Sequence, residues 1–155
     1  RTFGTIMSAA LHLAKPGDLE RLMPLVAAFH AEEALQSTED SRHAALTPLL
    51  DGSPHGAVYL IGPQRAPIGY LVVTFGWSVE FGGLDGFIDE IFIRSGVRGR
   101  GVGSEVITSL VAMLKSVGLK ALQLEVDPEN ARALRLYGRC HFKPRSGYQI
   151  MLRLL

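Results

Sequence analysis

The sequence has 155 residues, with 16 Lys and Arg side chains against 15 Asp and Glu, and a formal net charge of +1. Domains usually contain about 100–150 residues, so this length predicts a single domain over residues 1–155. The composition, 47% hydrophobic and 20% charged, excludes a disordered chain. A single cysteine, Cys140, excludes an intrachain disulfide and a zinc site built on cysteines.

Two expectations concern the start of the sequence and its surroundings. The stretch 1–6 precedes Met7-Ser8-Ala9, which resembles a natural start, so we interpret these residues as vector-derived. The longest apolar runs, such as Tyr70–Phe75, are too short to cross a bilayer, and no signal-like segment is recognised. The sequence therefore predicts a soluble cytoplasmic protein with no membrane partner.

Hydrophobic spacing and turn residues predict the elements in chain order. Apolar residues at helical spacing predict helices, and alternation of apolar and polar residues predicts strands. The order of elements predicts an α/β (α+β) protein with a mixed sheet. The elements are a strand over Ile6–Ala14, a helix from N-cap Asp18 to about Leu35, a helix over Thr38–Leu50, strands over Ala57–Ile61, Ile68–Trp77 and Phe87–Ile93, a helix from Gly103 to a cap at Gly118, a strand over Lys120–Val126, a helix opened by Asp127-Pro128 and ending near Cys140, and a final strand over Gly147–Leu154.

Charge is unevenly distributed along the sequence. Residues 1–86 carry five basic and nine acidic side chains, a net charge of −4, whereas residues 87–155 carry eleven and six, a net charge of +5. Such an asymmetry arises by surface drift, and it is also typical of a chain whose halves meet ligands of opposite charge. Charge alone leaves both interpretations open.

Three glycines stand between a predicted strand and the following helix. Gly99, Gly101 and Gly103 let a ligand approach the main chain closely, and the free N–H groups of a helix's first turn attract phosphate. Arg98 and Arg100 add positive charge at the same place. A flexible turn would use the same residues, but the position directly between strand and helix favours an anion site.

The common nucleotide and metal patterns are absent from the sequence. No Gly-Lys pair is followed by Ser or Thr, which excludes a P-loop. The fingerprint G-x-G-x-x-G fails because its third glycine would be Ser104 or Val106. Five histidines without metal-ligand spacing, and the lack of a basic stripe with interleaved aromatics, give no reason to expect a metal or nucleic acid.

Two sequence blocks carry a family resemblance. The first follows the pattern [QR]-x-x-G-x-[GA] over Arg98–Gly103, and the second covers Asn130–Tyr137, with alanine at its fourth position and leucine at its seventh. With both blocks in this order, the sequence resembles the GNAT superfamily of acyl-CoA-dependent N-acetyltransferases, firmly over Phe87–Phe142 and loosely before it. His141 departs from the glycine common in the family, which alters a turn after the helix. The resemblance implies a mostly antiparallel central sheet with a V-shaped splay and flanking helices.

The resemblance also implies acetyl-CoA as the cofactor. The amides of the glycine loop would cradle its pyrophosphate, and Arg98 and Arg100 would add charge nearby. Backbone groups of the preceding strand would pair with pantetheine, and a backbone amide there would stabilise an oxyanion. Asn130 would contact the cofactor, a role that the shared motif favours over its alternative as a polar residue of a first helical turn. The implied cofactor-binding residues are Ile91, Phe92, Ile93, Arg98, Gly99, Arg100, Gly101, Val102, Gly103, Ser104, Asn130 and Tyr137.

Three residues are candidates for proton transfer. By resemblance, Tyr137 is the general acid that protonates the departing thiolate, and its alternative role is aromatic packing. An alkylammonium has a pKa near 10, so the acceptor amine needs a base. Neighbouring residues of a strand project to opposite faces, so one of the adjacent carboxylates Asp89 and Glu90 would reach the cleft while the other points away. Glu90 is the first choice for the base and Asp89 the second. A surface ion pair is the alternative role for either carboxylate.

The sequence leads to one hypothesis for function and leaves its acceptor open. The hypothesis is an N-acetyltransferase that moves the acetyl group of acetyl-CoA directly to a primary amine of a small molecule. Acetylation of a protein or peptide amine is an alternative, and so is a non-catalytic acyl-CoA-binding sensor. The final strand, Gly147–Leu154, offers a route to a homodimer.

Overall fold

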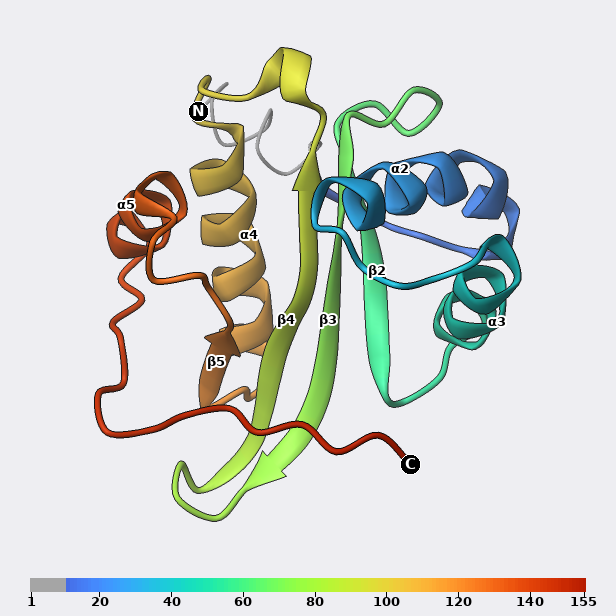
Figure 1. Cartoon of the computed structure of the whole chain (residues 1–155). Helices are drawn as coiled ribbons and strands as arrows, with labels where there is room; N and C mark the ends of the chain where they lie inside the picture. Colours follow the sequence, from blue (N-terminus) through green and yellow to red (C-terminus); the bar gives the residue numbers. More distant parts are fainter. Residues whose placement is uncertain (1–10) are drawn as a thin grey trace.

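The structure, a computed structural model, describes residues 11–155 (Figure 1). Short 3-10 turns, η1 and η2, accompany the regular helices and strands. In chain order the elements are β1 (Leu11–Leu13), η1 (Pro16–Asp18), α2 (Leu19–Glu32), α3 (Glu39–Leu50), β2 (Gly56–Ile61), β3 (Gly69–Ser78), β4 (Gly83–Ile93), η2 (Ser95–Val97), α4 (Val102–Ser116), β5 (Ala121–Leu124) and α5 (Ala131–Arg139).

The five strands form one sheet in the order β1-β2-β3-β4-β5. Neighbouring strands are antiparallel through β4, and β5 runs parallel to β4. In Figure 1, α2 and α3 lie on one side of the sheet, and α4 and α5 lie on the other. This arrangement confirms the predicted fold class. Among residues 11–155, no helix has the length and hydropathy of a membrane span.

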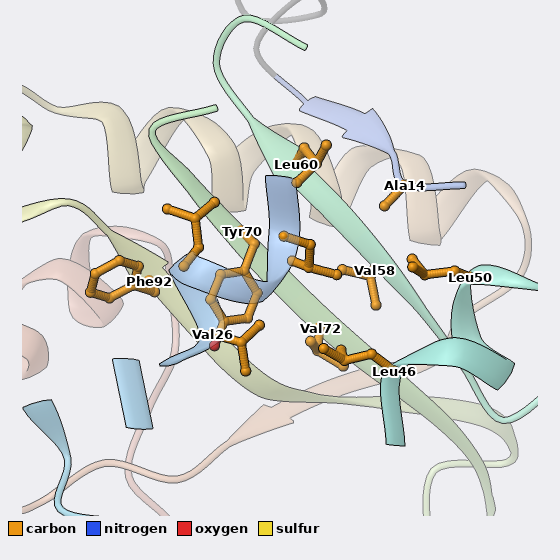
Figure 2. Close-up of a cluster of buried hydrophobic side chains, with 11 residues drawn as sticks. Ala14, Val26, Leu46, Leu50, Val58, Leu60, Tyr70, Val72 and Phe92 are labelled. Atoms are coloured by element: carbon orange, nitrogen blue, oxygen red, sulfur yellow. The ribbon is translucent and has the colours of Figure 1, made fainter. Parts of the chain in front are cut away.

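Each face of the sheet carries its own hydrophobic core. Helix α2 buries Leu22, Leu25 and Val26, which recur at helical spacing, in a cluster that includes Tyr70 (Figure 2). Helix α4 contributes to a second cluster on the opposite face. The buried residues of α4 are Gly103, Val106, Ile107, Leu110 and Leu114.

Strands β4 and β5 separate part-way along their length. Their pairing ends at Ile88 and Leu124, although β4 continues to Ile93. At the same point the pairing of β4 with β3 shifts register and leaves Asp89 unpaired in the ladder. A bulge of this kind bends a strand and re-aims its side chains. The sheet therefore opens between β4 and β5, which is the V-shaped splay that the family resemblance implies.

The last helix begins later than predicted. The predicted opening at Asp127-Pro128 is a turn instead, in which a carboxylate oxygen of Asp127 accepts the N–H of Glu129 at 2.9 Å. Asn130 is the N-cap, and its side-chain oxygen accepts the N–H of Ala133 at 3.1 Å. Side-chain bonds to nearby backbone compete with helix formation, which explains the later start.

Two boundaries in the first part of the chain also differ from the prediction. Helix α2 ends at Glu32 rather than near Leu35, because Ala34 adopts a left-handed conformation, with φ of 53°. Of the strand predicted over Ile6–Ala14, Leu11–Leu13 form β1, and residues 6–10 lie outside the described residues. The interpretation of residues 1–6 as vector-derived also falls outside them.

The predicted final strand over Gly147–Leu154 was wrong. Beyond α5 the described chain contains no helix or strand, and residues 143–155 run as an extended segment across one end of the sheet (Figure 1). A strand requires a hydrogen-bonded neighbour, and no strand of residues 11–142 pairs with this segment. The alternation that predicts a strand is present, but its partner is not supplied within the described chain.

Candidate active site

The loop between β4 and α4 exposes backbone amides at a helix N-terminus. Gly101 is the N-cap of α4, with φ of 78°, and Gly99 has the same φ. A Cβ on Gly101 would meet no atom within 4 Å, so the backbone conformation, not crowding, requires glycine there. Because glycine has no side-chain oxygen to cap the helix, the first-turn N–H groups remain available to an anion.

A cavity of about 310 Å³ lies beside this loop. Three arginines border it, Arg98 from the loop and Arg132 and Arg139 from α5. Its arginines, which outnumber the bordering Glu32 and Glu33, and its amides suit an anionic ligand. The lining residues are Phe29, Glu32, Glu33, Ile91, Phe92, Ile93, Val97, Arg98, Gly99, Gly101, Val102, Gly103, Ser104, Asn130, Arg132, Ala133, Leu136, Tyr137 and Arg139.

The two arginines of the loop differ in position. Arg98 donates from Nε to the carbonyl of Ile93 at 2.7 Å and from Nη2 to Glu32 at 2.8 Å, and its guanidinium lies 5.4 Å from the ring centre of Phe92. Arg98 therefore ties the loop to the end of β4 and to α2, while still bordering the cavity. Arg100 is exposed and does not border it.

A second cavity, of about 380 Å³, lies between the separated parts of β4 and β5. The two cavities share Phe29, Glu33, Ile91, Asn130, Ala133 and Tyr137. No lysine or arginine borders the second cavity, whereas five carboxylates do. These carboxylates belong to Glu33, Asp89, Glu90, Glu125 and Asp127.

Glu90 is held by two hydrogen bonds from the α2 side of the sheet. Its Oε1 accepts the hydroxyl of Tyr70 at 2.8 Å, and its Oε2 lies 2.7 Å from Nε2 of His30. Nδ1 of His30 lies 2.7 Å from the hydroxyl of Ser37, which also accepts a bond from Arg42 at 2.9 Å. An ionised carboxylate only accepts, so His30 carries its proton on Nε2 and can accept from Ser37 at Nδ1.

Asp89 and Glu90 have different surroundings, as their adjacency predicts. Asp89 is the bulged residue and is exposed, whereas the side chain of Glu90 is only 16% exposed. Each carboxylate oxygen of Glu90 accepts one hydrogen bond and can accept a second. Glu90 is therefore the better positioned of the two to receive a proton in the second cavity.

Tyr137 borders both cavities. Burial raises the pKa of its phenol, and the nearby carboxylate of Glu33 raises it further. Phe142 packs against it edge to face, with ring centres 6.0 Å apart. A phenol with a raised pKa keeps its proton at neutral pH and can donate it. The general-acid role of Tyr137 stays a prediction that this position supports.

Asn130 borders both cavities and also caps α5 through its side chain. The interpretation as a first-turn polar residue therefore has direct structural support, and its contact to a cofactor stays a prediction. Residues Ile91, Phe92 and Ile93 border the first cavity from β4, but the carbonyl of Ile93 is occupied by Arg98.

Three residues of the site were missed from the sequence. Arg132 and Arg139 are seven residues apart, which is two helical turns, and this spacing could have placed them on one face of α5. His30 borders neither cavity, and its contact with Glu90 joins residues 60 positions apart, which no local pattern reveals.

Comparison with known proteins identifies the family. The model of the Acetyltransferase (GNAT) family matches residues 19–142. The chain belongs to the GNAT acetyltransferase family. The match spans both sequence blocks that carried the resemblance, and it begins with α2, well before the stretch where the resemblance is firm.

Curated relatives match parts of the chain. An uncharacterized N-acetyltransferase of Methanocaldococcus jannaschii is 28% identical over 90 residues, which are 57% of this chain and 40% of that protein. The N-alpha-acetyltransferase MAK3 of Arabidopsis thaliana is 35% identical over 57 residues, 37% of this chain and 30% of that protein. The matched stretch thus spans less than half the length of each of these two relatives.

Solved structures match almost the whole chain. An integron cassette protein from the mobile metagenome of Cole Harbour Salt Marsh superposes with a TM-score of 0.83 at 29% identity, covering 99% of this chain and 94% of that one. A putative acetyltransferase from Arthrobacter sp. FB24 superposes with a TM-score of 0.75 at 27% identity, covering 94% of this chain and 93% of that one.

Proposed function

We propose that this GNAT protein transfers the acetyl group of acetyl-CoA directly to a primary amine of a small, cationic molecule. One observation carries the proposal. Two adjoining cavities that share Tyr137 differ in charge, because three arginines and two glutamates border the first, whereas five carboxylates and no basic residue border the second. An anionic acyl donor and a cationic acceptor are the pair of ligands that this arrangement suits.

The residues of the first cavity fit a ligand that carries phosphates. The N-terminus of α4 offers amides at a glycine N-cap, and a Cβ on Gly99 would lie 3.4 Å from the guanidinium of Arg132. Arg98 and Arg139 add charge on either side. When bound, the thioester of acetyl-CoA would supply an activated acetyl group with a good leaving thiolate. The loop Gly99–Ser104 would hold its pyrophosphate, although Arg100 does not border the cavity.

The second cavity fits a protonated amine. Its carboxylates would attract the cation, and Phe29 and Phe87 add aromatic surface beside them. A second positive charge on the acceptor would gain about 1.4 kcal/mol from one carboxylate at roughly 6 Å, taking an effective dielectric constant of about 40. The cavity therefore favours diamines over monoamines of equal length by about tenfold.

Two residues of the chain would move the protons. Glu90 would accept a proton from the ammonium group, which leaves the nitrogen lone pair free to bond to the acetyl carbon. The carbon–sulfur bond then breaks, and Tyr137 would donate its proton to the thiolate. The nitrogen still carries two protons after it bonds to the acetyl carbon, and it would give one of them to the phenolate of Tyr137, which leaves a neutral amide. Glu90 would then release its proton to solvent, so that one proton is set free in each turnover.

Release of free thiol from acetyl-CoA tests the proposal. We would follow it with a thiol reagent, using butylamine, 1,4-diaminobutane and a lysine-containing peptide as acceptors. The expected result is turnover with kcat/KM about tenfold higher for the diamine than for butylamine, an advantage that shrinks at 0.5 M salt. Thiol release equal to the rate without amine would refute the proposal. So would a peptide acceptor that exceeds both small amines.

A further inference from the structure

A chain of side-chain hydrogen bonds runs from Glu90 to the connection between α2 and α3. Oε2 of Glu90 lies 2.7 Å from Nε2 of His30, and Nδ1 of the same ring lies 2.7 Å from the hydroxyl of Ser37. The hydroxyl of Ser37 in turn accepts a bond from Arg42 at 2.9 Å. None of His30, Ser37 and Arg42 borders either cavity, so these three side chains reach the acceptor site only through Glu90.

Both ends of this chain fix the direction of its hydrogen bonds. A guanidinium has no acceptor, so Arg42 donates to the oxygen of Ser37, and an ionised carboxylate only accepts, so Glu90 receives from His30. The hydroxyl of Ser37 is then free to donate to Nδ1 of His30, and a neutral imidazole that accepts at Nδ1 carries its proton on Nε2. Because hydrogen bonds that run in one direction polarise one another, the chain stabilises this tautomer of His30.

The start of α3 holds Ser37 and Arg42 in place. Thr38, which follows Ser37, is the N-cap of α3, and its hydroxyl oxygen accepts the N–H of Ser41 at 3.1 Å. The carbonyl of Thr38 accepts the N–H of Arg42 at 3.0 Å, which places Arg42 at the end of the first helical turn. Among residues 11–155 Arg42 forms no ion pair, so its guanidinium is left to bond Ser37.

The other oxygen of Glu90 is held from the core. Tyr70 is fully buried, burial and the nearby carboxylate of Glu90 raise the pKa of its phenol, and it donates to Oε1 at 2.8 Å. A proton on Nδ1 of His30 would instead leave the Nε2 lone pair facing Oε2 at 2.7 Å. The two lone pairs would repel each other unless Glu90 carried a proton, and a protonated carboxyl group is no base.

We propose that Ser37 and Arg42 are positioning residues for Glu90. They hold His30 in the tautomer that donates to the carboxylate, and thereby keep that carboxylate ionised and oriented to receive a proton from the acceptor amine. This inference rests on the proposed function, in which Glu90 is the base. Ser37 contacts neither ligand and acts through His30, so loss of its hydroxyl should lower kcat and leave the affinity for acetyl-CoA unchanged.

Steady-state thiol release with 1,4-diaminobutane gives the first test. Ser37→Ala should lower kcat about fivefold, the factor that one neutral hydrogen bond is worth, with the KM for acetyl-CoA within about twofold of wild type. Ser37→Thr keeps the hydroxyl and should retain kcat within about twofold. Ser41→Ala is the matched control, because it removes a serine hydroxyl of the same connection that bonds to the backbone of Thr38 and not to His30. Equal losses of kcat in Ser37→Ala and Ser41→Ala would refute the proposal.

Imidazole NMR gives a second test that needs no turnover. Long-range proton–nitrogen correlation spectra at about pH 8, with His30→Gln to assign the ring signals, show which nitrogen of His30 carries the proton. We expect Nε2 in the wild type and in Ser37→Thr, and a mixture of tautomers in Ser37→Ala. A wild-type ring protonated on Nδ1 would overturn the proposal, as would a Ser37→Ala variant with either the wild-type tautomer or the wild-type kcat. A protein that shows the expected tautomers but acetylates no amine would overturn the proposed function, while the control of His30 by Ser37 would stand.

Discussion

Replacing Glu90 with glutamine tests the proposed base without emptying its site. The side chain keeps its size, and its carbonyl can still accept from Tyr70. Its amide can donate to Nε2 of His30 if the histidine proton moves to Nδ1. The change therefore replaces two charge-assisted bonds, of 2.7 and 2.8 Å, with neutral ones, at a cost of about 1–2 kcal/mol in folding stability.

The rate should respond far more than the stability. General acid–base catalysis typically contributes a factor of about 10²–10⁴, so kcat for Glu90→Gln should fall at least about 100-fold with an unchanged affinity for acetyl-CoA. The assay is steady-state thiol release with 1,4-diaminobutane, alongside thermal unfolding of each variant. Asp89→Asn removes a neighbouring but exposed carboxylate and should lower kcat less than about fivefold.

The reverse pattern would refute this reasoning. If kcat falls 100-fold in Asp89→Asn and stays within threefold of wild type in Glu90→Gln, the base is the bulged residue, Asp89. If kcat falls as far in His30→Gln as in Glu90→Gln, and the pH profiles of the two variants coincide, the contact between the two side chains matters as much as the carboxylate itself. The pH dependence of kcat/KM separates that positioning effect from a general loss of folding.

Three further outcomes follow from the structure. Tyr137→Phe should lower kcat about tenfold and leave acetyl-CoA affinity within twofold in a calorimetric titration, and the alkaline limb of the wild-type rate profile should lie above pH 10 because burial raises the pKa of this phenol. Gly69→Ala should destabilise the fold by more than about 2 kcal/mol in urea unfolding, because its Cβ would collide with the carbonyl oxygen of Phe92. Gly96→Ala meets no atom within 4 Å and should stay within about 0.5 kcal/mol of wild type. Leu110→Ala, at a side chain with 0% exposure, should cost about 2–5 kcal/mol in the same experiment; a cost below 1 kcal/mol would contradict the assigned core.

Features encoded by neighbouring residues were predictable from the sequence. The glycine loop and the helix after it follow from residues within one short stretch, and Gly101 has the left-handed conformation that such a loop needs. The block over Asn130–Tyr137 likewise identified α5, although Asp127 competes for the backbone and delays its start. Local pattern also predicted the segments that form β2 to β5, in their chain order.

Features that join distant residues were not predictable in this way. The contact between His30 and Glu90 depends on how α2 crosses the sheet, and no periodicity of either segment encodes it. The bulge at Asp89 depends on the register of two strands. Alternation in the segment after α5 predicts a strand, but a strand also needs a hydrogen-bonded neighbour, which alternation does not identify.

Titration of the protein with acetyl-CoA in a calorimeter tests the central claim most directly. The account predicts micromolar binding by the wild type and at least about 30-fold weaker binding by Gly101→Glu, since a carboxylate about 6 Å from a phosphate charge costs roughly 2–3 kcal/mol at an effective dielectric constant of about 20. Gly101→Ala, which has the same backbone strain without the charge, should bind less than about fivefold more weakly than wild type. Absence of binding by the wild-type protein, or equal affinity of Gly101→Glu and wild type, would contradict the assignment of the donor site to this loop.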